Sequence, residues 1–190
     1  MIPEKETLQF SSPQRTLVFQ ALTEAEERTT DYYCIPPFRW EQLHYDLLTR
    51  EDQGWEPLPD TMLARVRLLC RTGFQKEFDF YRIELNDYGI LTAAERENLL
   101  RSTDLYPFLV YILTHEMVHL VRLSTILDDR AGATVPCEET EESRVQDISH
   151  RILTDFSNLL PRLQKFCSPS LARNSLTDRS KPGPTRQVSH

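Results

Sequence analysis

Two histidines and a glutamate stand at the spacing that metal-dependent hydrolysis requires, in the stretch His115-Glu116-Met117-Val118-His119. Residues four apart on a helix project from the same face, so both imidazoles could reach one metal ion. Glu116 then lies where its carboxylate can take a proton from a metal-bound water. This H-E-x-x-H pattern is typical of zinc hydrolases, provided that it lies on a helix and that a third ligand is available.

The residues around the motif predict that it lies on a buried helix. Pro107 is favourable in the first turn of a helix, and residues from Phe108 to Val121 are apolar on nearly all sides. The helix is expected to end near Leu127. Imidazoles and a carboxylate are costly to bury without partners, which favours a metal site over a chance match with hydrogen-bonded core histidines.

No histidine is well placed to be the third ligand. The extended pattern H-E-x-x-H-x-x-G-x-x-H is excluded, because Arg122 occupies the glycine position and Thr125 the last histidine position. His150 falls opposite the apolar stripe of the last predicted helix and is expected to face water. His190 is the last residue of the predicted tail, so an acidic ligand remains.

Four glutamates at the start of the last predicted helix are the acidic candidates. Glu139 points away from the buried face that is centred on Val145, whereas Glu138, Glu141 and Glu142 lie nearer to it. Carboxylates near a helix N-terminus also have an ordinary explanation, which is stabilisation by the helix dipole. Helix geometry alone does not choose among Glu138, Glu141 and Glu142 as the third ligand.

The motif and the glutamate helix together resemble the gluzincins, the thermolysin-like zinc peptidases, and most closely their small intracellular forms. In that group the ligand helix has the pattern E-x-x-A-[N/D]-x-F-A-x-x-L-L. With Glu142 as its first residue, small or apolar residues of this chain fall at the core positions. Val145 replaces the usual alanine, and Gln146 replaces Asn or Asp. The resemblance covers residues 106–153 and implies Glu142 as the third ligand, with the other two open glutamates as alternatives.

The resemblance implies one zinc ion on His115, His119 and Glu142, and hydrolysis of peptide bonds in a peptide or protein substrate with Glu116 as general base. A strand predicted at residues 78–85 is then expected to hold the extended substrate by backbone hydrogen bonds. Four tyrosines are candidates for the residue that stabilises the oxyanion in larger members: Tyr81, Tyr88, Tyr106 and Tyr111. The alternative function is a non-catalytic zinc sensor or protein-interaction module that retains the zincin fold.

The remaining elements predict an α+β, helix-rich fold of the zincin type, in one domain over residues 1–167. Ser12-Pro13 is a good helix start, so the first helix is expected over residues 12–30. Further helices are predicted at residues 38–49, at residues 62–70, from the capping box at Thr92, and from residues 134–136 to about 160. The strand at residues 78–85 changes phase near Phe80-Tyr81, which suggests a bulge or cover on both faces, and a turn follows at residues 86–89.

Charge and composition narrow the partners and the location. The formal net charge of −7 disfavours contact with phosphate backbones, so no nucleic-acid partner is expected. No apolar run approaches the ~20 residues of a membrane span, and no secretory signal stands at the N-terminus, so the expected location is the cytoplasm. Residues 168–190 are rich in Ser, Pro, Arg and Thr and predict a disordered tail.

The four cysteines predict reduced thiols rather than a zinc site. Cys34, Cys70, Cys137 and Cys167 are scattered along the chain and form no C-x-x-C pair. The sequence therefore favours a metal site at the histidine motif over one built from cysteines. The oligomeric state stays open.

Overall fold

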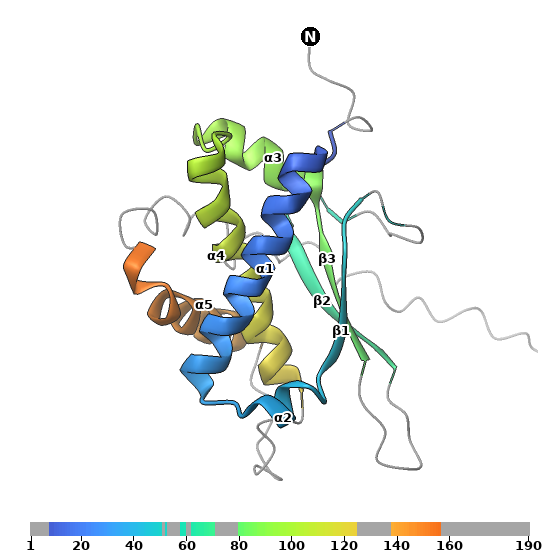
Figure 1. Cartoon of the computed structure of the whole chain (residues 1–190), viewed down its shortest axis with the longest axis vertical. Helices are drawn as coiled ribbons and strands as arrows, with labels where there is room; N and C mark the ends of the chain where they lie inside the picture. The colour runs from blue at the N-terminus through green and yellow to red at the C-terminus, as the bar shows by residue number, and fades with distance from the viewer. Residues whose placement is uncertain are drawn as a thin grey trace, which may run out of the picture.

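A three-stranded β-sheet lies against two long α-helices, and another helix crosses them on the side away from the sheet (Figure 1). The computed structural model describes residues 8–50, 52, 58–59, 62–70, 80–124 and 138–156. Within these residues the elements are α1 (Ser12–Tyr33), α2 (Pro37–Trp40), β1 (His44–Leu48), β2 (Ala64–Cys70), β3 (Phe80–Leu85), α3 (Asp87–Arg96), α4 (Ser102–Leu123), α5 (Glu138–Ile152) and the 3-10 turn η2 (Thr154–Phe156). The expected α+β, helix-rich class is thereby confirmed for the described part of the chain.

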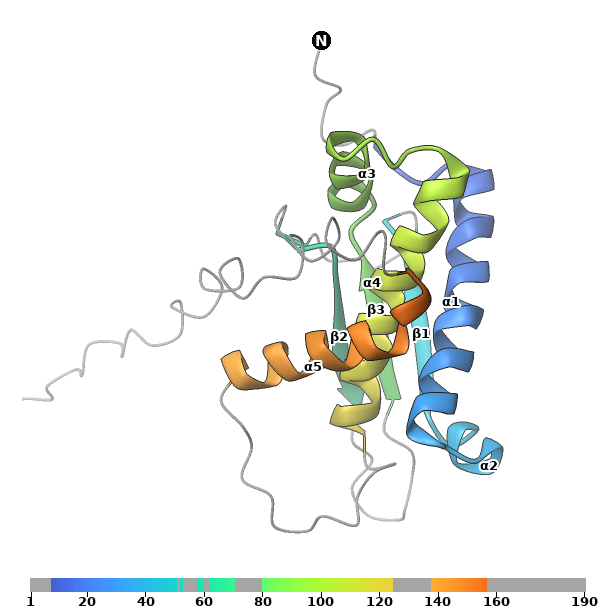
Figure 2. The same cartoon turned by 90° about the vertical axis from the view of Figure 1, so that its left-hand side faces the viewer.

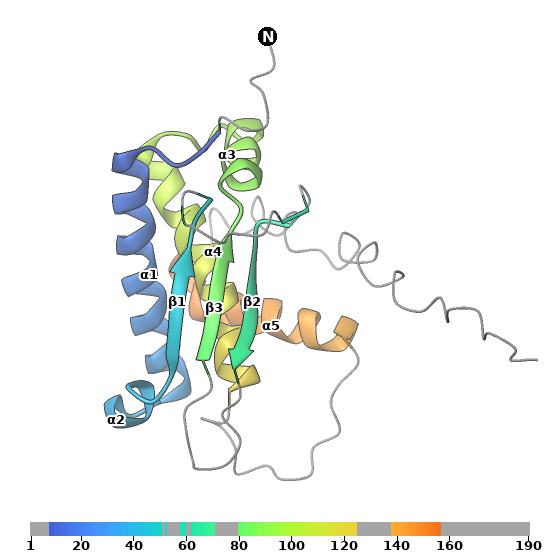
Figure 3. The same cartoon turned by 90° about the vertical axis from the view of Figure 1, so that its right-hand side faces the viewer.

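The layers are seen from two opposite sides in Figure 2 and Figure 3. In Figure 2 α5 is nearest to the viewer, and in Figure 3 the sheet is nearest, with α4 between them in both views. The α1 helix runs beside α4 along its length. This places α4, which carries the histidine motif, at the centre of the domain.

The central strand of the sheet is β3. The strand order is β1-β3-β2, with β1 parallel and β2 antiparallel to β3. Tyr81, Ile83 and Leu85 of β3 are buried in the core formed with the helices. On the opposite face Arg82 forms an ion pair with Asp46 of β1 at 2.9 Å. Such alternation is what a strand covered by helices on one face requires.

The predicted strand at residues 78–85 is confirmed from Phe80 onward, and residues 78–79 lie outside the described part. A register shift lies opposite the predicted bulge, because the pairing of β2 with β3 shifts between Leu68 and Cys70, opposite Tyr81 and Phe80, but it is not in the predicted strand. The extra residue therefore belongs to β2, and Phe80 is exposed while Tyr81 is buried.

Two predicted helices are wrong. The helix predicted at residues 38–49 is the short α2 followed by β1, and the helix predicted at residues 62–70 is β2. Over such short runs the apolar residues fit either a strand or a helix period. Each edge of β3 carries backbone groups that need partners, and pairing with it decides the conformation of both segments. His44 therefore lies on β1 opposite Phe80, and not in a helix.

Asn86 starts α3 earlier than the capping box at Thr92 predicts. The backbone N–H of Gly89 donates a hydrogen bond to Asn86 Oδ1 at 3.1 Å, as in other asparagine N-caps. The Asn86 amide also donates to the carbonyl of Met62 at 2.8 Å. The predicted turn at residues 86–89 is thus the first turn of α3, and Thr92 lies inside the helix.

The first helix is confirmed, and α1 continues to Tyr33, beyond the expected end near residue 30. Its N-cap is Ser11, whose backbone N–H donates to Gln14 Oε1 at 2.8 Å. Cys34 ends it in the left-handed conformation, with φ of 51°. Cys34 is a free, exposed thiol, and the side chains of the other cysteines lie outside the described part.

The helix predicted around the motif is confirmed as α4, which is buried over most of its length. Phe108, Leu109 and Leu113 have no exposed surface. Pro107 lies inside α4 rather than in its first turn, and α4 ends at Leu123 rather than near residue 127. No helix of the described residues is long and apolar enough to span a membrane. The predicted tail and the predicted start of the last helix lie outside the described residues.

Candidate metal centre

A row of polar side chains on α4 faces α5. The row follows one edge of an otherwise apolar helix and consists of Tyr111, His115, His119 and Arg122. Its members lie about one helical turn apart, which brings them to one face. The side chains of α5 that contact this row are His150, Glu142 and Glu141. The histidine motif therefore meets polar side chains of α5 where the two helices cross (Figure 2).

Three donor atoms converge where the two helices cross. The Nε2 atoms of His115 and His119 are 3.2 Å apart. Glu142 Oε1 lies 3.0 Å from His115 Nε2, and Glu142 Oε2 lies 3.1 Å from His119 Nε2. A tetrahedral zinc ion with bonds of about 2.0–2.1 Å would hold its donors roughly 3.3 Å apart. The three side chains thus form a group that could hold a metal ion.

Glu142 joins the histidines, and the alternative glutamates do not. Glu141 points to Arg122, which donates hydrogen bonds to it from Nε and, at 2.9 Å, from Nη2. The side chains of Glu138 and Glu139 lie outside the described part of the structure. Among the described residues, the resemblance and the geometry therefore select the same third side chain.

The prediction that His150 faces water is wrong. His150 is half-buried, its Nε2 lies 3.3 Å from the Tyr111 hydroxyl, and the two rings stack at 5.9 Å. Burial lowers the pKa of His150, so the ring is neutral at pH 7. Helical periodicity predicts the direction in which a side chain points, but it does not predict which residues of other elements pack against that side chain. His150 is not one of the three converging side chains.

The tyrosine candidates hold structural contacts. The Tyr81 hydroxyl donates to the carbonyl of Leu123 at 3.3 Å, and the Tyr106 hydroxyl donates to Glu24. The Tyr111 hydroxyl lies 3.3 Å from His150 Nε2. Nothing in the described contacts places Tyr88 at the histidines. The structure therefore singles out no oxyanion-stabilising tyrosine among the described residues.

The expectation that β3 binds substrate is wrong. β3 hydrogen-bonds to β1 on one side and to β2 on the other, over almost its whole length. Its backbone groups are therefore already paired, and an extended peptide has no edge of β3 to join.

Burial and mutual contact set the pKa values of the group. Burial by itself would raise the pKa of Glu142, but hydrogen bonds from His115 and His119 hold it well below its usual range. Burial would lower the pKa of His119, and the carboxylates of Glu142 and Glu116 raise it instead. Burial raises the pKa of Glu116, His119 and His115 oppose that rise, and the charge of Glu142 adds to it.

One ring nitrogen of the site lacks a partner. His115 Nδ1 is buried and makes no hydrogen bond, although metal-ligating histidines ordinarily donate from the second nitrogen to a carboxylate or carbonyl. Gln146, at the polar position of the family pattern, makes no hydrogen bond to a described side chain. The described residues thus contain the three donors, but none of them accepts the hydrogen bond from His115 Nδ1 that would orient this ring.

Arg122→Gln is expected to weaken zinc binding about tenfold to a hundredfold, the usual effect of losing a group that orients a ligand. The Arg122–Glu141 pair joins α4 to α5 one residue from Glu142, and both side chains are about three-quarters buried. Without it, α5 loses one of the side-chain contacts that hold it against α4 beside Glu142. Competition with a chromophoric chelator measures the affinity, and circular dichroism monitors the fold.

A charge swap controls this prediction. Arg122→Glu combined with Glu141→Arg should regain part of the lost affinity, because the two groups can pair again in reverse. Unchanged zinc affinity in a folded Arg122→Gln variant would show that this pair does not position Glu142.

Zinc affinity is expected to rise with pH from about 6 to 8. Metal binding requires a neutral imidazole, and the pKa of His119 is raised above its ordinary 6.5 in the metal-free protein. Below that pKa, a proton must leave for each ion bound, and affinity should gain roughly tenfold per pH unit before levelling off above it. Glu142, whose pKa is lowered, is ionised throughout and adds no slope. Zinc titrations at three pH values measure this, and a flat profile would contradict it.

Comparison of the chain with family models, with curated proteins and with solved structures finds no match. The case for the site rests on the chain itself. It has three parts: the donor types, the separations of 3.0–3.2 Å between their atoms, and a buried carboxylate beside the first histidine.

Proposed function

We propose that the protein hydrolyses peptide bonds with one zinc ion held by His115, His119 and Glu142, in the manner of the gluzincins and with a fold of zincin type. The observation that carries the proposal is the convergence of three donor atoms at separations close to those of a tetrahedral ion. A bound zinc would polarise the scissile carbonyl and lower the pKa of a water to about 7.

Glu116 has the role of general base in this proposal. Glu116 is 6% exposed and follows the first histidine on α4. Its carboxylate interacts electrostatically with all three proposed ligands. It takes a proton from the attacking water and delivers it to the leaving amine. Burial, which raises the pKa of Glu116, makes its carboxylate a better proton acceptor than an exposed glutamate.

β2 is the strand that we propose for an extended substrate. Within the described residues it pairs only with β3, which leaves its outer edge without a strand partner. Figure 3 shows β2 at the edge of the sheet over α5, whereas β1 lies at the opposite edge beside α1. Backbone hydrogen bonds along this edge would hold a peptide near the α4–α5 crossing.

A non-catalytic zinc sensor is the second candidate. The observation that favours it is the buried Nδ1 of His115, which has no hydrogen-bond partner. Outer contacts of this kind raise the basicity of the ligand and are needed for full metal affinity and activity. In this function, occupancy of the same three ligands would report zinc without hydrolysis.

Incubation with a peptide library separates the two functions. The zinc-loaded chain is mixed with peptides from a digested proteome, and new termini are read by mass spectrometry. The peptidase proposal predicts new termini that disappear with 1,10-phenanthroline and return with added zinc. One equivalent of bound zinc without any new termini would reject hydrolysis and leave the sensor.

A further inference from the structure

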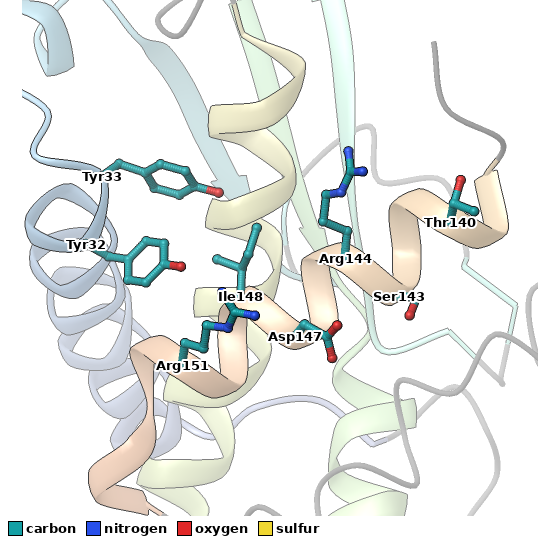
Figure 4. Close-up of a pocket in the computed structure, with 8 residues that line it drawn as sticks. All are labelled: Tyr32, Tyr33, Thr140, Ser143, Arg144, Asp147, Ile148 and Arg151. Carbon is teal, nitrogen blue, oxygen red and sulfur yellow. The ribbon is translucent and has the colours of Figure 1, made fainter. Parts of the chain in front are cut away.

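An open pocket lined by both polar and apolar groups lies between the end of α1 and the outer face of α5. Its volume is about 680 Å3, which is within the usual range for ligand sites. Tyr32 and Tyr33 enter it from α1, and Arg144, Ile148 and Arg151 enter it from α5 (Figure 4). The two tyrosine rings pack edge to face at 5.2 Å and make one wall.

The pocket is separate from the metal centre. At about 100° per residue, Arg144 lies roughly 200° around α5 from Glu142, on the other side of the helix. The pocket therefore has its own chemistry, and no metal ligand lines it.

Two arginines line this pocket without forming an ion pair with a described side chain. Arg144 and Arg151 are exposed and form no ion pair with another described side chain. Glu141 interacts electrostatically with Arg144, but the ion pair of its carboxylate is with Arg122. Both guanidinium groups are therefore free to bind an anion, in a chain whose net charge is −7.

The two charges are set apart along the helix. Arg144 and Arg151 lie two turns apart, about 10 Å along the helix axis. Asp147 lies between them and Ile148 lies beside it, with Tyr32 facing from α1. The ends of the pocket thus attract anions, while its middle repels them and offers apolar and aromatic surface.

The geometry points to an acidic segment of a partner protein in the polyproline II conformation as the occupant, with carboxylates at positions i and i+3 and apolar residues between them. A polyproline II helix has three residues per turn and rises about 3.1 Å per residue, so the two carboxylates lie on one face, roughly 9 Å apart along the axis. This is close to the separation of Arg144 and Arg151 along α5. The apolar residues between the acids would flank that face, within reach of Ile148 and Tyr32, and Asp147 would exclude a third acid. This assignment does not depend on whether the metal centre is catalytic.

Fluorescence anisotropy of a rhodamine-labelled peptide tests the assignment on the full chain. The probe has Glu-Leu-Leu-Glu between Gly-Ser flanks, and a second probe has both acids replaced by glutamine. Saturable binding of the first probe is expected, with the second at least about fivefold weaker. Arg144→Gln and Arg151→Gln should each weaken the first probe about threefold, the usual scale for an exposed ion pair.

Three controls decide between this site and general charge attraction. Arg101→Gln changes the net charge equally at an exposed position outside the pocket, and should leave binding unchanged. Asp147→Asn should improve binding of a probe with a third, central acid. Equal loss in Arg101→Gln, no saturable binding, or equally arginine-dependent binding of an oligothymidylate would each overturn the assignment.

Discussion

Glu142→Ala is expected to lower the zinc affinity about a hundredfold to a thousandfold, the largest effect predicted for a single α5 side chain. A zinc site that is worth about 10–16 kcal/mol over four ligands loses roughly 3–4 kcal/mol with one of them. Glu142 supplies both of its oxygens to the group, one toward each histidine. Chelator competition on the purified variant and on the unaltered protein measures the ratio.

The neighbouring glutamates are the matched controls for this prediction. Glu141→Ala removes the partner of Arg122 and should cost less, about tenfold to a hundredfold. Glu138→Ala should have little effect if its carboxylate is not a ligand. A larger loss in either of these variants than in Glu142→Ala would assign the third ligand to that residue instead.

Glu116→Gln is expected to lower kcat for peptide hydrolysis about a thousandfold while zinc remains bound. The amide has nearly the shape of the carboxylate but cannot accept a proton, and general-base catalysis contributes about 10²–10⁴-fold. KM should change little, because Glu116 acts on the attacking water and not on the peptide. Zinc affinity should stay within about threefold, since Glu116 is not among the converging donors.

Glu95→Gln is the control for Glu116→Gln, because Glu95 is an exposed glutamate on α3. It should keep full activity. If Glu116→Gln retained the activity of the unaltered protein with zinc in place, the proton would have to be taken by another group, and the proposed mechanism would be wrong.

The histidine pair could be predicted from sequence because its geometry is local. The spacing of His115 and His119 fixes their common face on any helix, and the surrounding apolar run indicates burial. The choice of Glu142 over Glu141 is not local. Adjacent residues point about 100° apart, and only the packing of α5 on α4 decides which one meets the histidines. The resemblance to a family pattern supplied what periodicity could not, and the structure places Glu142 accordingly.

The wrong elements share a physical cause. The segments at residues 38–49 and 62–70 are short, and their apolar residues satisfy two periods, so pairing with β3 determines their structure. The same non-local pairing makes β3 a central strand. Its backbone groups are paired on both sides and cannot bind an extended substrate. The N-cap at Asn86 is a local feature that the sequence alone could have indicated, because asparagine is a common N-cap. Residues 86–89 were instead expected to form a turn. The Arg122–Glu141 pair had no sequence signal, because it depends on how α5 crosses α4.

X-ray absorption at the zinc edge of the metal-loaded protein tests the central claim most directly. Two histidines and one carboxylate predict a first shell of nitrogen and oxygen at about 2.0–2.2 Å, with outer scattering from two imidazoles. The Glu142→Ala variant, loaded under the same conditions, should lose one oxygen and keep both imidazoles. Sulfur at about 2.3 Å would place zinc on the cysteines, and a shell with fewer than two imidazoles would contradict the assignment of His115 and His119.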